Sequence, residues 1–170
     1  MGKTTACDRL VILRPDVRRY AASELLRAAT RRSSEELRTA SAGRIRDNQK
    51  LIRAELQRRL EPGVSGPVVI EAHSVIDNGT QLVAIPLAVV ADLEPSRLVF
   101  LEAAPKVILR RRASQAEGRG VVRDPKQIGY HQDAALTQAQ EYARELGLPL
   151  YRLRTDRSFN VLDIVGSARD

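Results

Sequence analysis

The sequence predicts an α/β fold in which helices flank a parallel sheet. Helical and strand patterns alternate along all 170 residues, without an internal repeat or a low-complexity linker. The segments between successive strand patterns are long enough to hold a helix, which favours parallel pairing. A chain of this length is able to form one domain with a substantial core, so we expect a single domain over residues 1–170.

The strand patterns are short apolar runs between turn residues. Residues 17–21 form the first, and the run from Pro67 to Glu71 is β-branched and ends in a carboxylate. A continuous apolar run of this kind is typical of a strand buried on both faces. Two further strands are expected at 97–101 and 149–153.

The helix patterns lie between these strands. A short helix over 4–11 should end before Pro15, since proline cannot continue a helix. Ser23 is the expected cap of the next helix. The segment 34–60 is predicted to form one long helix, or two helices with a bend near Gly43. Ser34 is its expected N-cap. The remaining helices are expected at 82–93, 105–116, 126–146 and 158–168.

Composition excludes several classes of protein. The net charge is +7, but only 4% of the residues are aromatic and Trp is absent. Stacking platforms for bases are therefore poorly supplied, which disfavours nucleic acid as a partner, whereas the arginine bias suits bidentate contacts to phosphate. Cys7 is the only cysteine, and neither a secretory segment nor an apolar run of about 18 residues is present. We therefore expect a cytoplasmic protein that does not enter a membrane.

The first candidate site is the N-terminal string Gly2-Lys3-Thr4-Thr5. It has the second half of the phosphate-loop pattern G-x-x-x-x-G-K-[ST] and precedes a helix. In such a loop backbone N–H groups bind phosphate, the lysine reaches the β- and γ-oxygens, and the adjacent hydroxyl ligates Mg²⁺. A lysine at the start of an ordinary surface helix is the alternative interpretation.

The second candidate site lies at the end of the buried strand, where Glu71 and His73 follow the apolar run. Open α/β sheets bind their ligands at this edge. A carboxylate there is suited to holding the Mg²⁺ hydration shell or orienting an attacking oxygen in phosphoryl transfer. The alternatives are an ion pair between Glu71 and an arginine, and a histidine that is only packed and hydrogen-bonded.

The third candidate site is the arginine-rich stretch from Arg110 to Asp124. Gly118 and Gly120 predict a mobile loop. Arginines on such a loop are able to close over a triphosphate, exclude water and neutralise developing charge. The alternative is a solvated basic helix end.

In their order and spacing these motifs resemble the archaeal-type adenylate kinases and their bacterial nucleotide-kinase-like, ATP-binding relatives, all P-loop NTPases. The likeness covers nearly the whole chain. It is carried by Gly2-Lys3-Thr4-Thr5 (Walker A end), Glu35-Glu36-Leu37-Arg38 ((D/E)-x-M-R), Val69-Ile70-Glu71-Ala72-His73-Ser74 (V-V-D-T-H-S), Ile85-Pro86, Leu93-Glu94-Pro95, Arg110-Arg111, Arg123-Asp124 and Ile128-Gly129-Tyr130-His131-Gln132 (I-x-x-H-Q).

The resemblance implies a P-loop nucleoside-kinase-like fold that transfers the γ-phosphoryl group of ATP, with Mg²⁺, to a nucleotide or small acceptor. It implies an acceptor-binding helical region at about 22–60 and an arginine-rich lid at about 110–125. The implied catalytic residues are Lys3, Glu71, Arg119 and Arg123. The implied cofactor-binding residues are Gly2, Lys3, Thr4, Thr5, Arg110 and Arg111. The implied metal ligands are Thr4 and Glu71, and the implied substrate-binding residues are Arg38 and His73.

The chain departs from the family pattern at three places. The family's aspartate is Glu71 here, and Leu136 stands where an arginine follows the H-Q pair. The first strand of the sheet, normally central and about five residues long, is missing ahead of the loop. We expect that the start codon was placed too late, with a GTG valine codon read as Met1. Because Leu136 replaces a phosphate-binding arginine of the family, the resemblance implies phosphoryl transfer more firmly than AMP as the acceptor.

Two other functions remain open. A nucleotide-binding ATPase or regulatory module without kinase activity is favoured if Glu71 and Leu136 reflect lost catalysis. A basic nucleic-acid-binding protein would show steeply salt-dependent binding to oligonucleotides. The sequence determines neither the acceptor nor the oligomeric state.

Overall fold

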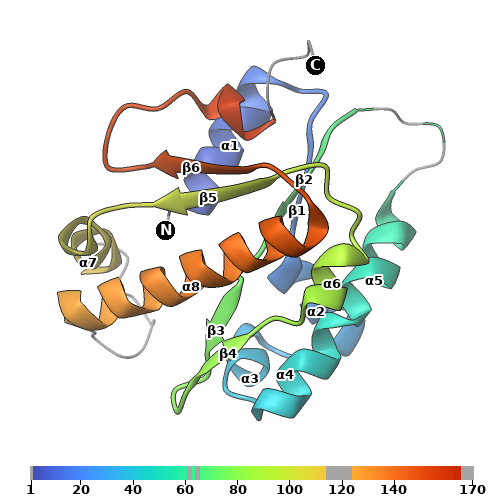
Figure 1. Ribbon diagram of the computed structural model, residues 1–170. Helices are drawn as coiled ribbons and strands as arrows, with labels where there is room; N and C mark the ends of the chain where they lie inside the picture. Colours follow the sequence, from blue (N-terminus) through green and yellow to red (C-terminus); the bar gives the residue numbers. More distant parts are fainter. Residues whose placement is uncertain (1, 61–62, 64–65, 114–123, 166–170) are drawn as a thin grey trace. The chain divides into compact units, whose positions relative to one another are not determined.

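Figure 1 shows the computed structural model, which describes residues 2–60, 63, 66–113 and 124–165. The chain divides into two compact units. The larger unit comprises Lys3–Pro95 and the segment that begins at Asn160, and the smaller unit comprises Ser96–Phe159 together with Gly2. Helices alternate with parallel strand pairs in the described residues, which confirms the predicted α/β class.

The larger unit contains a parallel pair of strands, β1 (Arg18–Ala21) and β2 (Val68–Glu71), in which Arg19 lies opposite Val69. Both strands were expected from their apolar runs. Helix α1 (Lys3–Leu13) contacts both of them. Helix α1 is therefore packed against the strand that ends in Glu71.

The predicted 34–60 helix is three helices. They are α3 (Ser34–Arg38), α4 (Ala42–Gln49) and α5 (Leu51–Arg59), and they follow α2 (Ala22–Thr30). The chain breaks because serine side chains cap new helix starts: Ser33 Oγ accepts from the Glu36 N–H, and Ser41 Oγ accepts from the Arg44 N–H. Ser23 and Ser34, the caps expected from the sequence, instead lie inside α2 and α3.

Apolar side chains from α2, α3 and α5 form one core of the larger unit. Leu25 is fully buried at its centre. The buried members are Ala22, Leu25, Leu26, Leu37, Ile52 and Leu56. This packing holds the helical region to the strand pair, because Tyr20 of β1 and Ile70 of β2 pack against the same cluster.

The prediction of a helix over 82–93 is wrong in its first half. Residues of β3 (Val75–Asp77) and β4 (Leu82–Ala84) form an antiparallel hairpin, and α6 covers only Leu87–Ala91. Asn78 makes the turn, since its side-chain Oδ1 accepts from the N–H groups of the two residues before Leu82. Pro86 then stands at the start of α6.

The smaller unit contains a second parallel pair, β5 (Leu98–Glu102) and β6 (Leu150–Arg154), as predicted. Helices α7 (Pro105–Ala113) and α8 (Pro125–Leu146) lie between these strands in the chain. Asp124 caps α8, and Gly147 ends it with a φ of 63°, a conformation that favours glycine. The described residues of α8 agree with the predicted helix over 126–146.

The last predicted helix, over 158–168, is a short 3₁₀ turn, η1 (Val161–Ile164), in the described residues. Asn160 caps it through a side-chain oxygen that accepts from the Leu162 N–H. The single domain over 1–170 and its acceptor region at 22–60 stay predictions. Residues 114–123, which make up most of the expected lid, lie outside the described residues.

Candidate functional site

The hydroxyl of Thr4 and the carboxylate of Glu71 meet in the larger unit. Thr4 stands in the first turn of α1, and Glu71 is the buried last residue of β2. Thr4 Oγ1 donates to Glu71 Oε2 at 3.2 Å. Two side chains that the sequence proposed as metal ligands therefore lie in contact, because α1 packs on the strand pair.

Lys3 stands beside this contact. Its Nζ lies 3.4 Å from His73 Nε2, just beyond the end of β2. Burial lowers the pKa of Lys3, while the negative charge of Glu71 opposes that shift. The structure thus brings Lys3, Thr4, Glu71 and His73 together from two segments far apart in the sequence.

Glu71 also forms an ion pair with Arg19 of β1. Arg19 Nε donates to Glu71 Oε1, and Arg19 Nη1 donates to Asp8 Oδ1 of α1 at 2.7 Å. The ion-pair alternative for Glu71 is therefore observed, together with its contact to Thr4. Both contacts exist because the carboxylate has two oxygens, each with its own partner.

Sequence reasoning missed Arg19 and Asp8 as members of this cluster. Side chains two residues apart on a strand share a face, so Glu71 lies on the face of Val69, the residue opposite Arg19. The alternation was readable in the sequence, but the register that sets Arg19 opposite Val69 was not. Asp8 is one helical turn after Thr4, and this spacing was the only local signal for it.

Cys7 of α1 is a buried neighbour of Glu71. Burial raises the pKa of its thiol to about 12, and the negative charge of Glu71 and a hydrogen bond to it act in the same direction. The thiol is therefore protonated at neutral pH. Its burial and raised pKa disfavour a role as a nucleophile.

Gly2 and Thr5 are the remaining predicted loop residues. Gly2 has a φ of 102°, a backbone conformation that favours glycine. Thr5 is exposed on α1.

Arg38 is held separately by residues of its own helix and of the hairpin. Its guanidinium donates to both carboxylate oxygens of Glu35, at 2.5 and 3.0 Å, and to the carbonyl oxygen of Asp77 at 3.1 Å. These contacts link α3 to β3. A phosphate group that binds Arg38 has to compete with the Glu35 carboxylate.

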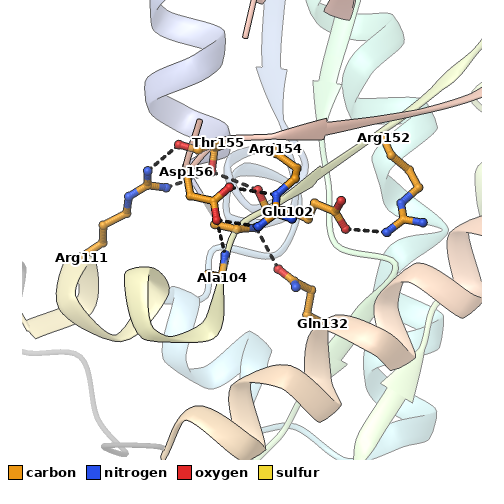
Figure 2. A network of polar contacts seen from close by, with 9 residues as sticks. Glu102, Ala104, Arg111, Gln132, Arg152, Arg154, Thr155 and Asp156 are labelled. Carbon is orange, nitrogen blue, oxygen red and sulfur yellow. Dashed lines mark hydrogen bonds and ion pairs between the residues drawn. The ribbon is translucent and has the colours of Figure 1, made fainter. Parts of the chain in front are cut away.

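Figure 2 shows Arg111 in a polar network of the smaller unit. Arg111 of α7 donates to Thr155 Oγ1 at 2.9 Å and to the Thr155 carbonyl oxygen at 2.6 Å. Asp156 accepts from the Ala104 N–H at 2.8 Å. The start of α7 and the Arg111 side chain are therefore both tied to the turn that follows β6.

The remaining predicted lid residues are Arg110, Arg119 and Arg123. Arg110 is exposed on α7. Arg119 and Arg123 lie outside the described residues.

The donor set at Thr4 and Glu71 fits Mg²⁺. Both groups offer oxygen, which is the ligand that this cation prefers. Within the described ranges, no group of three or more His, Cys, Asp or Glu side chains that could hold a metal ion occurs. Mg²⁺ is usually held by one or two carboxylates together with substrate phosphates, so this pair suits a cation that arrives with a nucleotide.

A family model described as an AAA domain matches residues 1–128. The chain belongs to this family. It is also similar to the adenylate kinases of Thermococcus kodakarensis, with 34% identity over 88 residues (51% of this chain and 45% of the relative), and of Pyrococcus abyssi, with 30% identity over 108 residues (58% and 55%). The adenylate kinase of Pyrococcus furiosus is 29% identical over 119 residues (64% and 61%).

This member of the AAA domain family is thus a P-loop NTPase that resembles adenylate kinase, as its motifs predicted. The chain spans about half the length of the curated relatives that it matches, from 45% to 61%. No helix in the described part of the chain combines the length and apolarity that crossing a membrane requires.

Proposed function

We propose that this protein binds ATP with Mg²⁺ and transfers the γ-phosphoryl group to a nucleotide or another small acceptor. The observation that carries the proposal is the contact between the Thr4 hydroxyl and Glu71 Oε2, with Lys3 beside it at the start of α1. A hydroxyl, a carboxylate and a lysine gathered at a helix N-terminus suit a phosphate–metal complex. The similarity to adenylate kinases supports the same chemistry.

In this proposal Lys3 binds the β- and γ-phosphate oxygens. Burial lowers the pKa of Lys3, and phosphate oxygens would supply charged acceptors for its ammonium group. Thr4 and Glu71 hold the cation that accompanies the nucleotide. Bound Mg²⁺ neutralises charge on the phosphate oxygens.

The phosphoryl acceptor is proposed to bind through Arg38 and His73. His73 lies just beyond the end of β2, beside Lys3. The arginine fork matches the geometry of a phosphate group, which favours a monophosphate as acceptor. Arg110, Arg111, Arg119 and Arg123 are proposed to bind the triphosphate or to neutralise charge during transfer. Positioning and charge neutralisation supply most of the rate in such reactions.

A nucleotide-binding module without transfer is the second candidate. The bidentate contact between Glu35 and Arg38 favours it, since this carboxylate occupies the group proposed to hold the acceptor. The two candidates differ in a single outcome: the module binds ATP but transfers no phosphate to any acceptor.

The test measures ATP binding by calorimetry with Mg²⁺, and phosphate transfer to a panel of nucleoside monophosphates. We expect Lys3→Met to lower ATP affinity about tenfold or more and transfer by about 10²–10³-fold. Lys50→Met is the matched control, because Lys50 is exposed. Within the described residues, its ion-pair partner is the exposed Asp47. Unchanged ATP affinity and transfer in Lys3→Met would show that the proposal is wrong.

A further inference from the structure

The guanidinium of Arg19 lies between two acidic side chains of the larger unit. It donates from Nε to Glu71 Oε1 and from Nη1 to Asp8 Oδ1, the latter at 2.7 Å. The Glu71 side chain is only 6% exposed, and that of Arg19 is 24% exposed. A carboxylate this deeply buried requires a positive partner, so the ion pair strongly influences where the carboxylate points.

The two oxygens of Glu71 have different partners. Oε1 accepts from Arg19, whereas Oε2 accepts from the Thr4 hydroxyl at 3.2 Å. A glutamate side chain has several rotatable bonds, and a contact at one oxygen restricts the other. The ion pair at Oε1 therefore keeps Oε2 beside the Thr4 hydroxyl.

Helix α1 contributes to both ends of this arrangement. Thr4 and Asp8 are one turn apart on the helix and lie on the same face. Asp8 holds Arg19, Arg19 holds Glu71, and Glu71 accepts from Thr4. The carboxylate is therefore fixed to the same helix that carries the proposed phosphate-binding residues.

We propose that Arg19 is the positioning residue of the Glu71 carboxylate. It fixes Oε1 so that Oε2 remains beside the Thr4 hydroxyl, where the Mg²⁺ of a bound nucleotide is held. This inference rests on the proposed function. Arg19 acts through Glu71, and Asp8 acts through Arg19.

The test compares ATP affinity in Mg²⁺ with ATP affinity in EDTA, both measured by calorimetry on the full chain. The ratio of these affinities reports the metal contribution separately from the phosphate contribution of Lys3. Groups that orient a metal ligand typically change metal affinity by about 10–100-fold when they are removed. We expect Arg19→Met to reduce the ratio about tenfold and to change the affinity in EDTA less than about twofold.

Two milder variants keep the test decisive if Arg19→Met does not fold. Arg19→Lys retains the charge but loses the forked donors, so its ratio should lie between those of the wild type and Arg19→Met. Asp8→Asn weakens the second contact of Arg19 and should lower the ratio by a smaller amount. Arg18→Met is the matched control, since successive strand residues point to opposite faces and the charge change is the same.

An unchanged ratio in Arg19→Met, or in Arg19→Lys and Asp8→Asn together, overturns the inference and leaves the proposed function intact. A raised ratio also overturns it, because it would mean that Arg19 only competes with Mg²⁺ for Glu71. If the wild-type chain binds no ATP in either condition, the proposed function fails, and the inference fails with it.

Discussion

Asp156 accepts a hydrogen bond from the backbone N–H of Ala104 at 2.8 Å, and this contact joins the turn after β6 to the start of α7. The same carboxylate forms an ion pair with Arg154 at 2.9 Å. Both contacts favour the ionised form. They lower the pKa of Asp156, with the hydrogen bond from Arg154 as the larger cause. Arg111 binds the neighbouring Thr155, so the network also sets the orientation of α7.

We expect Asp156→Asn to lower the unfolding temperature at neutral pH. Because the pKa is lower in the folded protein, the carboxylate stabilises the fold above its ordinary pKa of 3.8, and this contribution is lost as the pH falls through the folded-state pKa. The difference between variant and wild type should therefore shrink below about pH 3.8. Asp47→Asn, an exposed change, should have little effect at either pH. A difference that does not change with pH would contradict the prediction.

Cys7 should resist alkylation in the folded protein. Its thiol is buried, and its pKa of about 12 leaves roughly a thousandfold less thiolate than an ordinary thiol has at about pH 8. Iodoacetamide labelling followed by mass spectrometry measures the rate. We expect native labelling to be slower by at least about that factor than labelling in denaturant. Equal rates in the two conditions would be inconsistent with the buried, protonated thiol.

Leu25→Ala should destabilise the larger unit strongly. Leu25 is fully buried in the cluster of α2, α3 and α5, and a cavity left by a buried leucine costs about 2–5 kcal/mol of unfolding free energy. Leu13→Ala removes the same atoms from an exposed position and should cost less than about 0.5 kcal/mol. Urea denaturation of both variants provides the comparison, and similar costs for the two changes would argue against the packing described.

Arg38→Met should weaken acceptor binding while leaving ATP binding nearly unchanged. A charge-assisted contact to phosphate contributes about 1.5–3 kcal/mol, so the KM of a nucleoside monophosphate should rise about 10–100-fold. Arg53→Met, which breaks an exposed ion pair with Glu94, is the control. Steady-state kinetics with each substrate varied in turn separates the two effects.

The matching change on the partner of Arg38 is Glu35→Gln. It removes the negative charge that phosphate has to displace from Arg38, so we expect the KM of the acceptor to fall. A higher KM in Glu35→Gln would indicate instead that Glu35 orients Arg38 for the acceptor.

Several local features could be predicted because they depend on neighbours in the sequence. The strand ending in Glu71, the helix expected over 4–11 and the long helix expected over 126–146 all correspond to elements of the structure, with ends that differ by at most two residues. Each has an apolar pattern of the right period or a residue that starts or ends it. The hairpin after His73 was missed, because an apolar run such as Leu82–Ala84 is compatible with both helix and strand.

The sequence by itself determined the residue types of the proposed site and the local elements that carry them: a lysine and a threonine at a helix start, and a carboxylate at the end of a strand. Only the tertiary structure decided their partners. Arg19 meets Glu71 through the register of β1 and β2, and Arg38 meets Asp77 through the packing of α3 near the hairpin. Local propensity and spacing act over a few residues, whereas these contacts depend on register and packing between distant segments.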